Sequence, residues 1–258
     1  MFTDLFFVSG IDLVDITLWA FTIFFFGLVF VLNRESHREG FPLETEQGGT
    51  VEDMNSLRVP LPKTYKLPHG RGEVSFPNMK RESRTLALAA TSSTPGSPFV
   101  PTGDPLKDGV GPASWSERQD VPDLTLDGDH RIVPYRVASG YTVEENDIDP
   151  RGLPVIAGDG KKVGTVSDLW VDRSEAIIRY YEVTLDGGEI PKRVLVPFAF
   201  SVVKKDALRV EAIYAEHFDG VPTTKTPDSV TRLEEDKISG YFGGGKLYAS
   251  KDRQEPWI

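Results

Sequence analysis

Residues 13–32 read LVDITLWAFTIFFFGLVFVL, and this stretch divides the chain into two unlike parts. It contains one charged side chain, Asp15, near its start. At ~1.5 Å rise per residue it makes a helix of ~30 Å, the thickness of a bilayer's hydrocarbon core. A soluble helix would show a polar face, and a cleavable signal peptide would have a basic start and a shorter apolar run. The sequence therefore predicts one transmembrane helix, which we place at residues 11–33.

The charges that flank this helix predict its orientation. Asp4 and Asp12 precede it, Arg34 and Arg38 follow it at once, and all 29 Lys and Arg lie after it. Because positively charged flanks stay on the cytoplasmic side, we expect residues 1–10 outside the cell membrane and the bulk of the chain in the cytoplasm.

Composition narrows what the rest of the chain can do. A length of 258 residues suffices for one good-sized domain or two small ones. The chain has no cysteine, which excludes disulfides, thiolate metal sites and cysteine nucleophiles. Its formal net charge is −10, so nucleic acid is not expected as a partner.

Residues 34–105 are rich in Pro, Gly, Ser and Thr, and the recurring prolines forbid long helices. Two readings are open, a disordered linker or an extended cytoplasmic arm that lies on a partner. Interspersed apolar side chains such as Val59, Tyr65 and Phe99 favour the arm, because a pure linker gains nothing from them.

Residues 106–258 read as a strand-rich domain that ends in a helix. Short runs of β-branched and aromatic residues, such as IIRYYEVTL at 177–185, are separated by turn signals such as Asp159-Gly160. Their spacing predicts a small antiparallel barrel or sandwich. The stretch TPDSVTRLEEDKISGYFGGGK reads as a helix that Thr226 or Asp228 caps and the glycines at 243–245 end.

The usual signatures of enzymes and cofactor sites are missing from the sequence. The glycines at 158–164 lie in an expected hairpin, and Gly243–Lys246 follows a helix rather than opening one, so neither predicts a phosphate loop. The run Asp127-Gly128-Asp129-His130 has no calcium-loop continuation, which favours a solvated turn. The apolar span contains no histidine and so offers no imidazole to a chlorophyll magnesium.

Residues 164–175, GTVSDLWVDRSE, combine a strand pattern with three acids. Strand alternation puts Asp168, Trp170 and Asp172 on one face and leaves Glu175 in the following turn. Two readings are open, an ordinary wet face or a row of carboxylates that do chemistry, and strand geometry alone does not choose between them.

Several motifs together resemble one family, the H subunit of the purple-bacterial photosynthetic reaction centre. They occur in order along nearly the whole chain: NRESHREGFPLE, PKTYKLPHGRG, PTGDPLKDGVGPASW, DPRGLPV, GTVSDLWVDRSE and LEEDKISGYFGGGKLYA. Residues from about 151 to 215 also look like a PRC-barrel, a domain shared with some RNA-processing proteins. The resemblance implies a single transmembrane helix plus a mainly-β cytoplasmic domain, a small antiparallel PRC-type barrel with a C-terminal helix.

The resemblance implies a subunit that is not an enzyme and holds no cofactor or metal of its own. Such a subunit caps the cytoplasmic face of the L and M subunits, which hold bacteriochlorophyll, bacteriopheophytin, quinones and a non-haem iron. Protons for the secondary quinone pass through this cap. Membrane lipids, a light-harvesting 1 antenna and a cytochrome c subunit are further candidate partners. The implied location is the bacterial inner (intracytoplasmic) membrane, with residues 1–10 in the periplasm.

The resemblance also assigns candidate relay residues. Glu175 matches the family glutamate close to the secondary quinone site, Asp172 an aspartate of the same region, and Arg179 a nearby arginine. A solvated carboxyl, with a pKa of ~4, is a poor proton donor at pH 7, but burial or a neighbouring carboxylate raises that pKa. We expect Glu175 as the main relay with Asp172 in support, and Asp168 as a surface or turn-stabilising acid.

Proton entry is expected at Asp127, Asp129 and His130. Some family members have a surface pair of histidines there, whereas this chain has one histidine with two acids, a set that can still act as a proton antenna. A membrane-anchored PRC-barrel adaptor for another membrane or RNA-processing complex is the alternative function. The motifs outside the barrel and the acidic charge argue against it.

Overall fold

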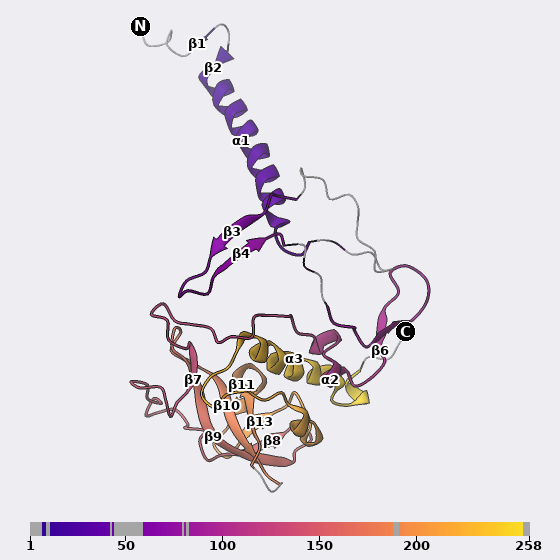
Figure 1. The fold of residues 1–258 in the computed structure, drawn as a ribbon, viewed down its shortest axis with the longest axis vertical. Coiled ribbons are helices and arrows are strands. Elements are labelled where there is room, and N and C mark those ends of the chain that lie inside the picture. The colour runs from indigo at the N-terminus through magenta and orange to yellow at the C-terminus, as the bar shows by residue number, and fades with distance from the viewer. Residues whose placement is uncertain are drawn as a thin grey trace. The chain divides into compact units, whose positions relative to one another are not determined.

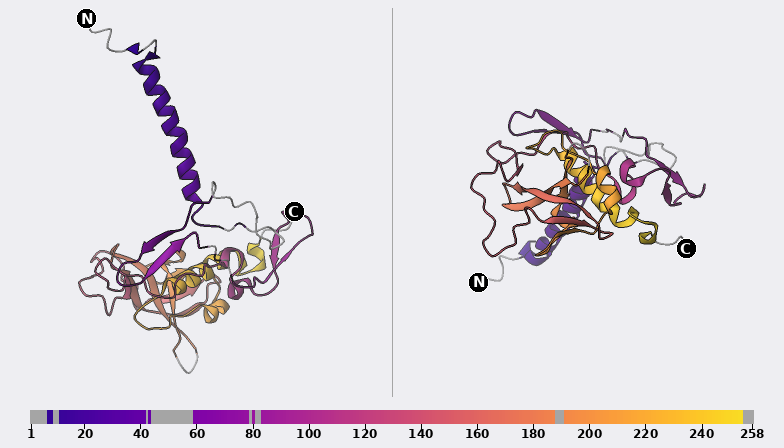
Figure 2. Two further views of the ribbon diagram at one scale, coloured as in Figure 1. Left: turned by 45° about the horizontal axis from the view of Figure 1, so that its top comes forward. Right: turned by 90° about the horizontal axis from the view of Figure 1, so that it is seen from below.

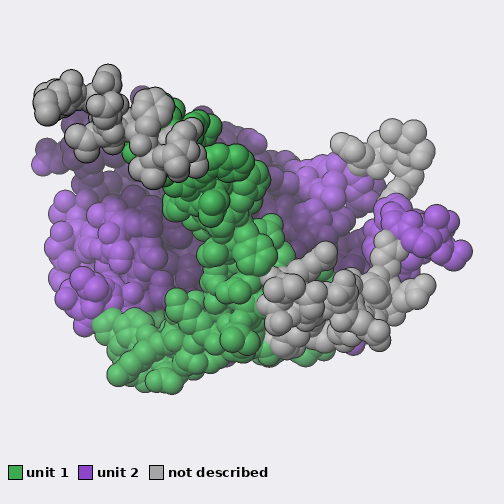
Figure 3. All heavy atoms as spheres, turned by 90° about the horizontal axis from the view of Figure 1, so that it is seen from above, with its two compact units in different colours: residues 1–83 green, residues 84–258 purple. Residues whose placement is uncertain are grey.

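The computed structural model describes residues 7–8, 11–41, 43, 59–78, 80, 83–187 and 191–254. The chain divides into two compact units, residues 1–83 and residues 84–258, which Figure 3 colours separately. The division falls inside the segment that the sequence predicts as one extended arm.

The first unit contains one long helix, α1 (Leu13–Ser36), shown in Figures 1 and 2. None of its described side chains is buried, and by length and composition it can cross a membrane. The hydroxyls of Thr17 and Thr22 donate to backbone carbonyls four residues earlier, at 2.8 Å each. Neither hydroxyl therefore brings an unpaired donor into the apolar helix surface. The expected apolar helix is thus present and extends to Ser36. Two short paired strands precede it, β1 (Phe7–Val8) and β2 (Ile11–Asp12).

Hairpins, not long helices, occupy the described part of the proline-rich segment. In the first unit β3 (Lys63–Lys66) pairs with β4 (Glu73–Phe76). Arg38, just past the end of α1, donates to the carbonyls of Leu61 and Phe76 at 2.9 and 3.0 Å and so attaches this hairpin to the helix end. In the second unit β5 (Leu88–Ala90) pairs with β6 (Phe99–Pro101).

The second unit is built on one curled sheet of seven strands in the described residues. The strand order is β11-β10-β9-β8-β13-β12, and β7 also pairs with β9. All pairs are antiparallel except β8 with β13, which is parallel and departs from the expected all-antiparallel barrel. The strands are β7 (Ile132–Pro134), β8 (Pro154–Ala157), β9 (Lys162–Asp172), β10 (Ile177–Leu185), β11 (Arg193–Pro197), β12 (Val202–Val203) and β13 (Leu208–Val210).

One apolar core joins this sheet to the C-terminal helix, α3 (Arg232–Tyr248). Val166, Val183 and Val196 of the sheet, and Ile238 and Phe242 of the helix, are at most 1% exposed. Burial of each such side chain stabilises the fold by roughly 1.5–3 kcal/mol. The short helix α2 (Pro105–Asp108) and the 3₁₀ turn Gly111–Ala113 lie against α3.

The start of α3 differs from the expected one. The hydroxyl of Thr231 accepts from the Glu234 backbone N–H at 3.1 Å, and the Glu234 carboxylate accepts from the Thr231 N–H at 2.8 Å. This reciprocal capping box satisfies two backbone donors at the helix start. The prediction that Thr226 or Asp228 caps the helix is therefore wrong, since Thr226 closes a turn ahead of it.

The glycines expected to end α3 lie inside the helix. A Cβ added to Gly244 would clash with Ala113, and one added to Gly245 would clash with Ile213. One on Gly240 would lie 2.8 Å from the Ala113 carbonyl oxygen. The glycines therefore form a flat face on which the Gly111–Ala113 turn and the chain after β13 pack directly, and the prediction of a glycine stop is wrong.

Gly244→Ala is expected to lower the free energy of unfolding by about 1–3 kcal/mol, because the added methyl group overpacks the contact with Ala113. Gly243→Ala is the matched control, since its Cβ would meet Pro112 and Phe200 at 3.4 and 3.7 Å, near ordinary contact distances. It should gain up to ~1 kcal/mol from helix propensity. Urea unfolding of both full-length variants measures the difference. Equal effects would contradict the close-packing role of this face.

Candidate functional site

Asp172 stands at the end of β9 and is fully buried, at 0% exposure. Its Oδ1 accepts from the backbone N–H groups of Ser174 and Glu175 at 2.9 and 3.2 Å, so the carboxylate organises the turn that follows the strand. Arg131 Nε donates to both of its oxygens at 3.0 and 2.9 Å. This end of the strand is therefore not an ordinary solvent-exposed face.

Arg131 joins the acids of this region, and sequence reasoning missed it. Besides Asp172, its guanidinium reaches Glu175 Oε1 at 2.5 Å and Asp123 Oδ2 at 3.5 Å. Hydrogen bonding to Asp172 raises the pKa of Arg131, so it stays a cation at any physiological pH. Arg179 lies 3.8 Å from Asp172 and 4.0 Å from Glu175. The structure thus brings the three candidate relay residues, Glu175, Asp172 and Arg179, into one cluster around Arg131.

Glu175 is the accessible member of this cluster. Its side chain is 50% exposed, whereas that of Asp172 is enclosed. Its carboxylate thus meets solvent while it contacts Arg131 and lies 4.0 Å from Arg179. Asp172 is occupied by backbone donors and by Arg131, and it holds the geometry of the turn.

The candidate entry residues Asp127, Asp129 and His130 lie exposed in a tight turn that leads directly into Arg131. Backbone hydrogen bonds from Thr125 N to Asp129 O and from Arg131 N to Asp123 O, both 2.8 Å, hold this turn. The Asp129 carboxylate lies 3.8 Å from Arg173. Within the described residues, no group of three or more His, Asp or Glu side chains could hold a metal ion.

Asp168 is buried at 7% exposure, so the prediction of a surface acid is wrong. The alternative, a turn-stabilising acid, fits better, because Asp168 Oδ2 accepts from the backbone N–H of Arg136 in the turn after β7 at 3.4 Å. Arg136 donates to Asp168 at 2.8 Å and to Glu182, itself 4% exposed, at 3.0 Å. Glu182 also accepts from Trp170 Nε1 at 3.0 Å. The expectation failed because β9 is a central strand that is covered on both faces, so its acids need a buried partner. Arg136 further reaches Asp228 at 3.0 Å and links the sheet to the turn before α3.

A polar cleft of about 470 Å³ opens beside the Arg131 cluster, between β10, the segment before β7 and the first turns of α3. Three ion pairs line it: Arg232 with Asp123 at 2.6 Å, Arg131 with Asp123 at 3.5 Å, and Arg118 with Asp236 at 3.1 Å. Burial acts to raise the pKa of Asp123, but the hydrogen bond and charge of Arg232 outweigh burial and hold that pKa below its usual value.

Tyr180 and Glu235 form the one contact in this cleft between a phenol and a carboxylate. The Tyr180 hydroxyl, on a side chain 4% exposed, donates to Glu235 Oε2 at 3.1 Å. Burial raises the pKa of both groups; for Glu235 the Tyr180 hydrogen bond and the Arg179 charge oppose that shift without cancelling it. Sequence reasoning missed Glu235 because acids are common in the first turn of any helix.

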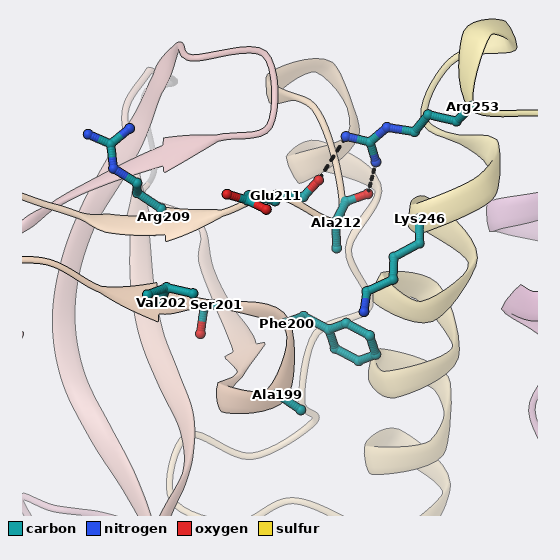
Figure 4. Close-up of a pocket in the computed structure, with 9 residues that line it drawn as sticks. All are labelled: Ala199, Phe200, Ser201, Val202, Arg209, Glu211, Ala212, Lys246 and Arg253. Carbon is teal, nitrogen blue, oxygen red and sulfur yellow. Dashed lines mark hydrogen bonds between the residues drawn. The ribbon is translucent and has the colours of Figure 1, made fainter.

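A second cavity, of about 420 Å³, lies at the other end of α3 (Figure 4). The Arg253 guanidinium donates there to the carbonyls of Glu211 and Ala212 at 2.8 Å each and of Gly245 at 2.9 Å. The ammonium of Lys246 lies 5.1 Å from the centre of the Phe200 ring. Arg253 is therefore a structural cross-link between the end of α3 and the chain after β13.

The curled sheet with its C-terminal helix and the separate apolar helix define a class, a PRC-barrel protein with a candidate membrane anchor. Residues 142–217 match the PRC-barrel domain family. Residues 5–137, more than half of the chain, match the family described as photosynthetic reaction centre, H-chain N-terminal region. The chain belongs to the photosynthetic reaction centre H-chain family. Proteins of this family are non-catalytic, non-pigmented subunits of a membrane-associated photosynthetic complex.

Arg131→Met is expected to lower the free energy of unfolding by about 2–4 kcal/mol, because it strips the buried Asp172 of its closest cation. Arg173→Met is the control, since Arg173 pairs at 3.8 Å with an exposed carboxylate, a contact worth under ~1 kcal/mol. Chemical denaturation of the two full-length variants measures both values. A cost for Arg131→Met no larger than that of the control would contradict the central role of Arg131.

Proposed function

We propose that this chain is the H subunit of a photosynthetic reaction centre, which caps the cytoplasmic face of the L and M subunits and stabilises the complex. The observation that carries the proposal is the match of residues 5–137 to the H-chain N-terminal region, because this match covers α1 and the hairpins outside the barrel. The PRC-barrel match alone would fit the adaptor alternative equally well. Bacteriochlorophyll, bacteriopheophytin, quinones and iron belong, in this proposal, to the partner subunits.

The proposed location is the bacterial inner membrane, with residues 1–10 in the periplasm and the second unit in the cytoplasm. The charges on either side of α1 support this orientation, with Asp12 before the helix and Arg34 and Arg38 at its end. A light-harvesting 1 antenna, a cytochrome c subunit and membrane lipids are the further partners of such a complex.

We infer a second task for the chain, the conduction of protons from the cytoplasm to the secondary quinone. A quinone site under a protein cap receives protons through side chains and the waters between them. Glu175 is the proposed main relay, supported by its half-exposed carboxylate and its contacts with Arg131 and Arg179. Asp172 supports Glu175 by holding its turn, and Asp127, Asp129 and His130 supply the exposed entry.

When the full-length chain is purified by an affinity tag from its native membrane in mild detergent, bacteriochlorophyll is expected to co-purify with it. The ratio of bacteriochlorophyll absorption to the amount of chain should stay constant across the purified fractions. The same procedure on untagged membranes is the control. A pigment-free chain bound to unrelated proteins would overturn the reaction-centre assignment and favour the adaptor.

Glu175→Gln is expected to slow the proton-coupled second electron transfer to the secondary quinone about tenfold or more at neutral pH, because the amide cannot carry a proton. The effect should fall below the ~10²–10⁴-fold contribution of a direct general acid, since waters offer a partial bypass. Flash-induced absorption changes in the assembled complex measure this step.

Primary charge separation should be unchanged in this variant, because it needs no proton. Glu216→Gln removes a carboxylate that is 76% exposed on another part of the surface and is the matched control. Second-transfer kinetics equal to those of the control would remove Glu175 from the relay.

A further inference from the structure

The polar cleft beside Arg131 holds three carboxylates with unequal surroundings. Asp123 is paired with Arg232 at 2.6 Å, and Asp236 with Arg118 at 3.1 Å. Across residues 83–187 and 191–254, Glu235 forms no ion pair within 4.0 Å, and its hydrogen-bond partner is the buried hydroxyl of Tyr180. One acid of the cleft is thus left without a cation in contact.

The pKa values of Glu235 and Asp123 differ as these unequal surroundings imply. Burial raises the pKa of Glu235, whereas the contact with Arg232 lowers that of Asp123 in the same cleft. A raised pKa brings a carboxyl closer to the pH at which it can both take up and release a proton. Three charged groups on neighbouring elements act on Glu235: Arg179 of β10, and Arg131 and Asp123 of the segment before β7. Two further charged side chains of the cleft, Arg232 and Asp236, lie on the same helix as Glu235.

We propose that Glu235 takes up and releases a proton inside this cleft and so forms a further step of the relay that leads to Glu175. The inference rests on the proposed proton-conducting function and extends it to a residue on α3. The connection is geometric, because Arg131 and Arg179 both lie within 4.0 Å of Glu175 and both line the same cleft as Glu235.

The step needs only protons and water. Oε2 of Glu235 accepts the Tyr180 hydrogen bond, so Oε1 is the oxygen that takes up a proton and makes the carboxyl neutral. The cleft water that gives this proton receives another from the solvent side, so that no hydroxide is left. Release of the Oε1 proton to a second water restores the carboxylate. A cleft of about 470 Å³ has room for a chain of waters, given a share of ~30 Å³ for each. Tyr180 remains a donor throughout, since burial and the Glu235 charge raise its pKa.

The test is Glu235→Gln in the assembled reaction centre, with Asp236→Asn as the matched control from the next position in the same cleft. The glutamine oxygen can still accept from Tyr180, so the fold is expected to be retained. We expect proton uptake on quinone reduction to slow about threefold or more with Glu235→Gln and to stay within twofold of the parent with Asp236→Asn.

Two readouts test the protonation of Glu235 directly. The infrared C=O band of a protonated carboxylic acid should be missing in Glu235→Gln and present in the control. In urea unfolding, the parent chain should lose stability as pH rises through the raised folded-state pKa, because ionised Glu235 is disfavoured in the fold. Glu235→Gln should lack this part of the pH dependence.

The outcomes separate this inference from the function on which it rests. If Glu175→Gln slows proton uptake and Glu235→Gln changes neither uptake nor the infrared band, Glu235 is not part of the relay. If neither variant slows uptake, the proposed proton conduction itself fails. Slowing by Asp236→Asn as large as that by Glu235→Gln would also overturn the inference, because the effect would then belong to the cleft's total charge.

Discussion

The burial of one ionised group, the Asp172 carboxylate, constrains much of the second unit. Removing a carboxylate from water costs several kcal/mol unless cations and hydrogen-bond donors replace the lost solvent. Arg131 and two backbone N–H groups supply that replacement. The same contacts fix the turn that carries Glu175 and the segment that enters β7. The position of Glu175 therefore depends on satisfying the buried Asp172 carboxylate.

The site also lies where the two matched family regions meet. Arg131 belongs to the stretch that matches the H-chain N-terminal region, whereas Asp172 and Glu175 belong to the PRC-barrel stretch. Ala113 from the first region also lies against the glycine face of α3, a helix that follows the PRC-barrel stretch in the chain. Residues 84–258 accordingly form one compact unit, although the family boundary runs through it.

The sequence was sufficient for features that depend on local pattern and insufficient for those that depend on distant partners. The apolar run and the alternating strands predicted α1 and the sheet, since periodicity alone decides them. The burial of Asp168 was missed because its partner, Arg136, is distant in sequence and the cover on both faces of β9 cannot be read from β9 itself. Glu175 was proposed as a relay residue through family resemblance, whereas nothing local distinguishes Glu235 from an ordinary first-turn acid. The α3 glycines were read as a helix stop because the contact that requires them, the close approach of Ala113, involves a residue far away in the chain.

That glycine face bears on the order in which the chain can fold. Each glycine inside a helix costs up to ~1 kcal/mol relative to alanine, and α3 carries Gly240 and Gly243–Gly245. The isolated helix is therefore intrinsically weak and is stabilised by its packing against the sheet core and the Gly111–Ala113 turn. During synthesis that turn leaves the ribosome long before α3 exists. The turn therefore lacks its packing partner until α3 has been made, so this contact can close only late in the synthesis of the unit.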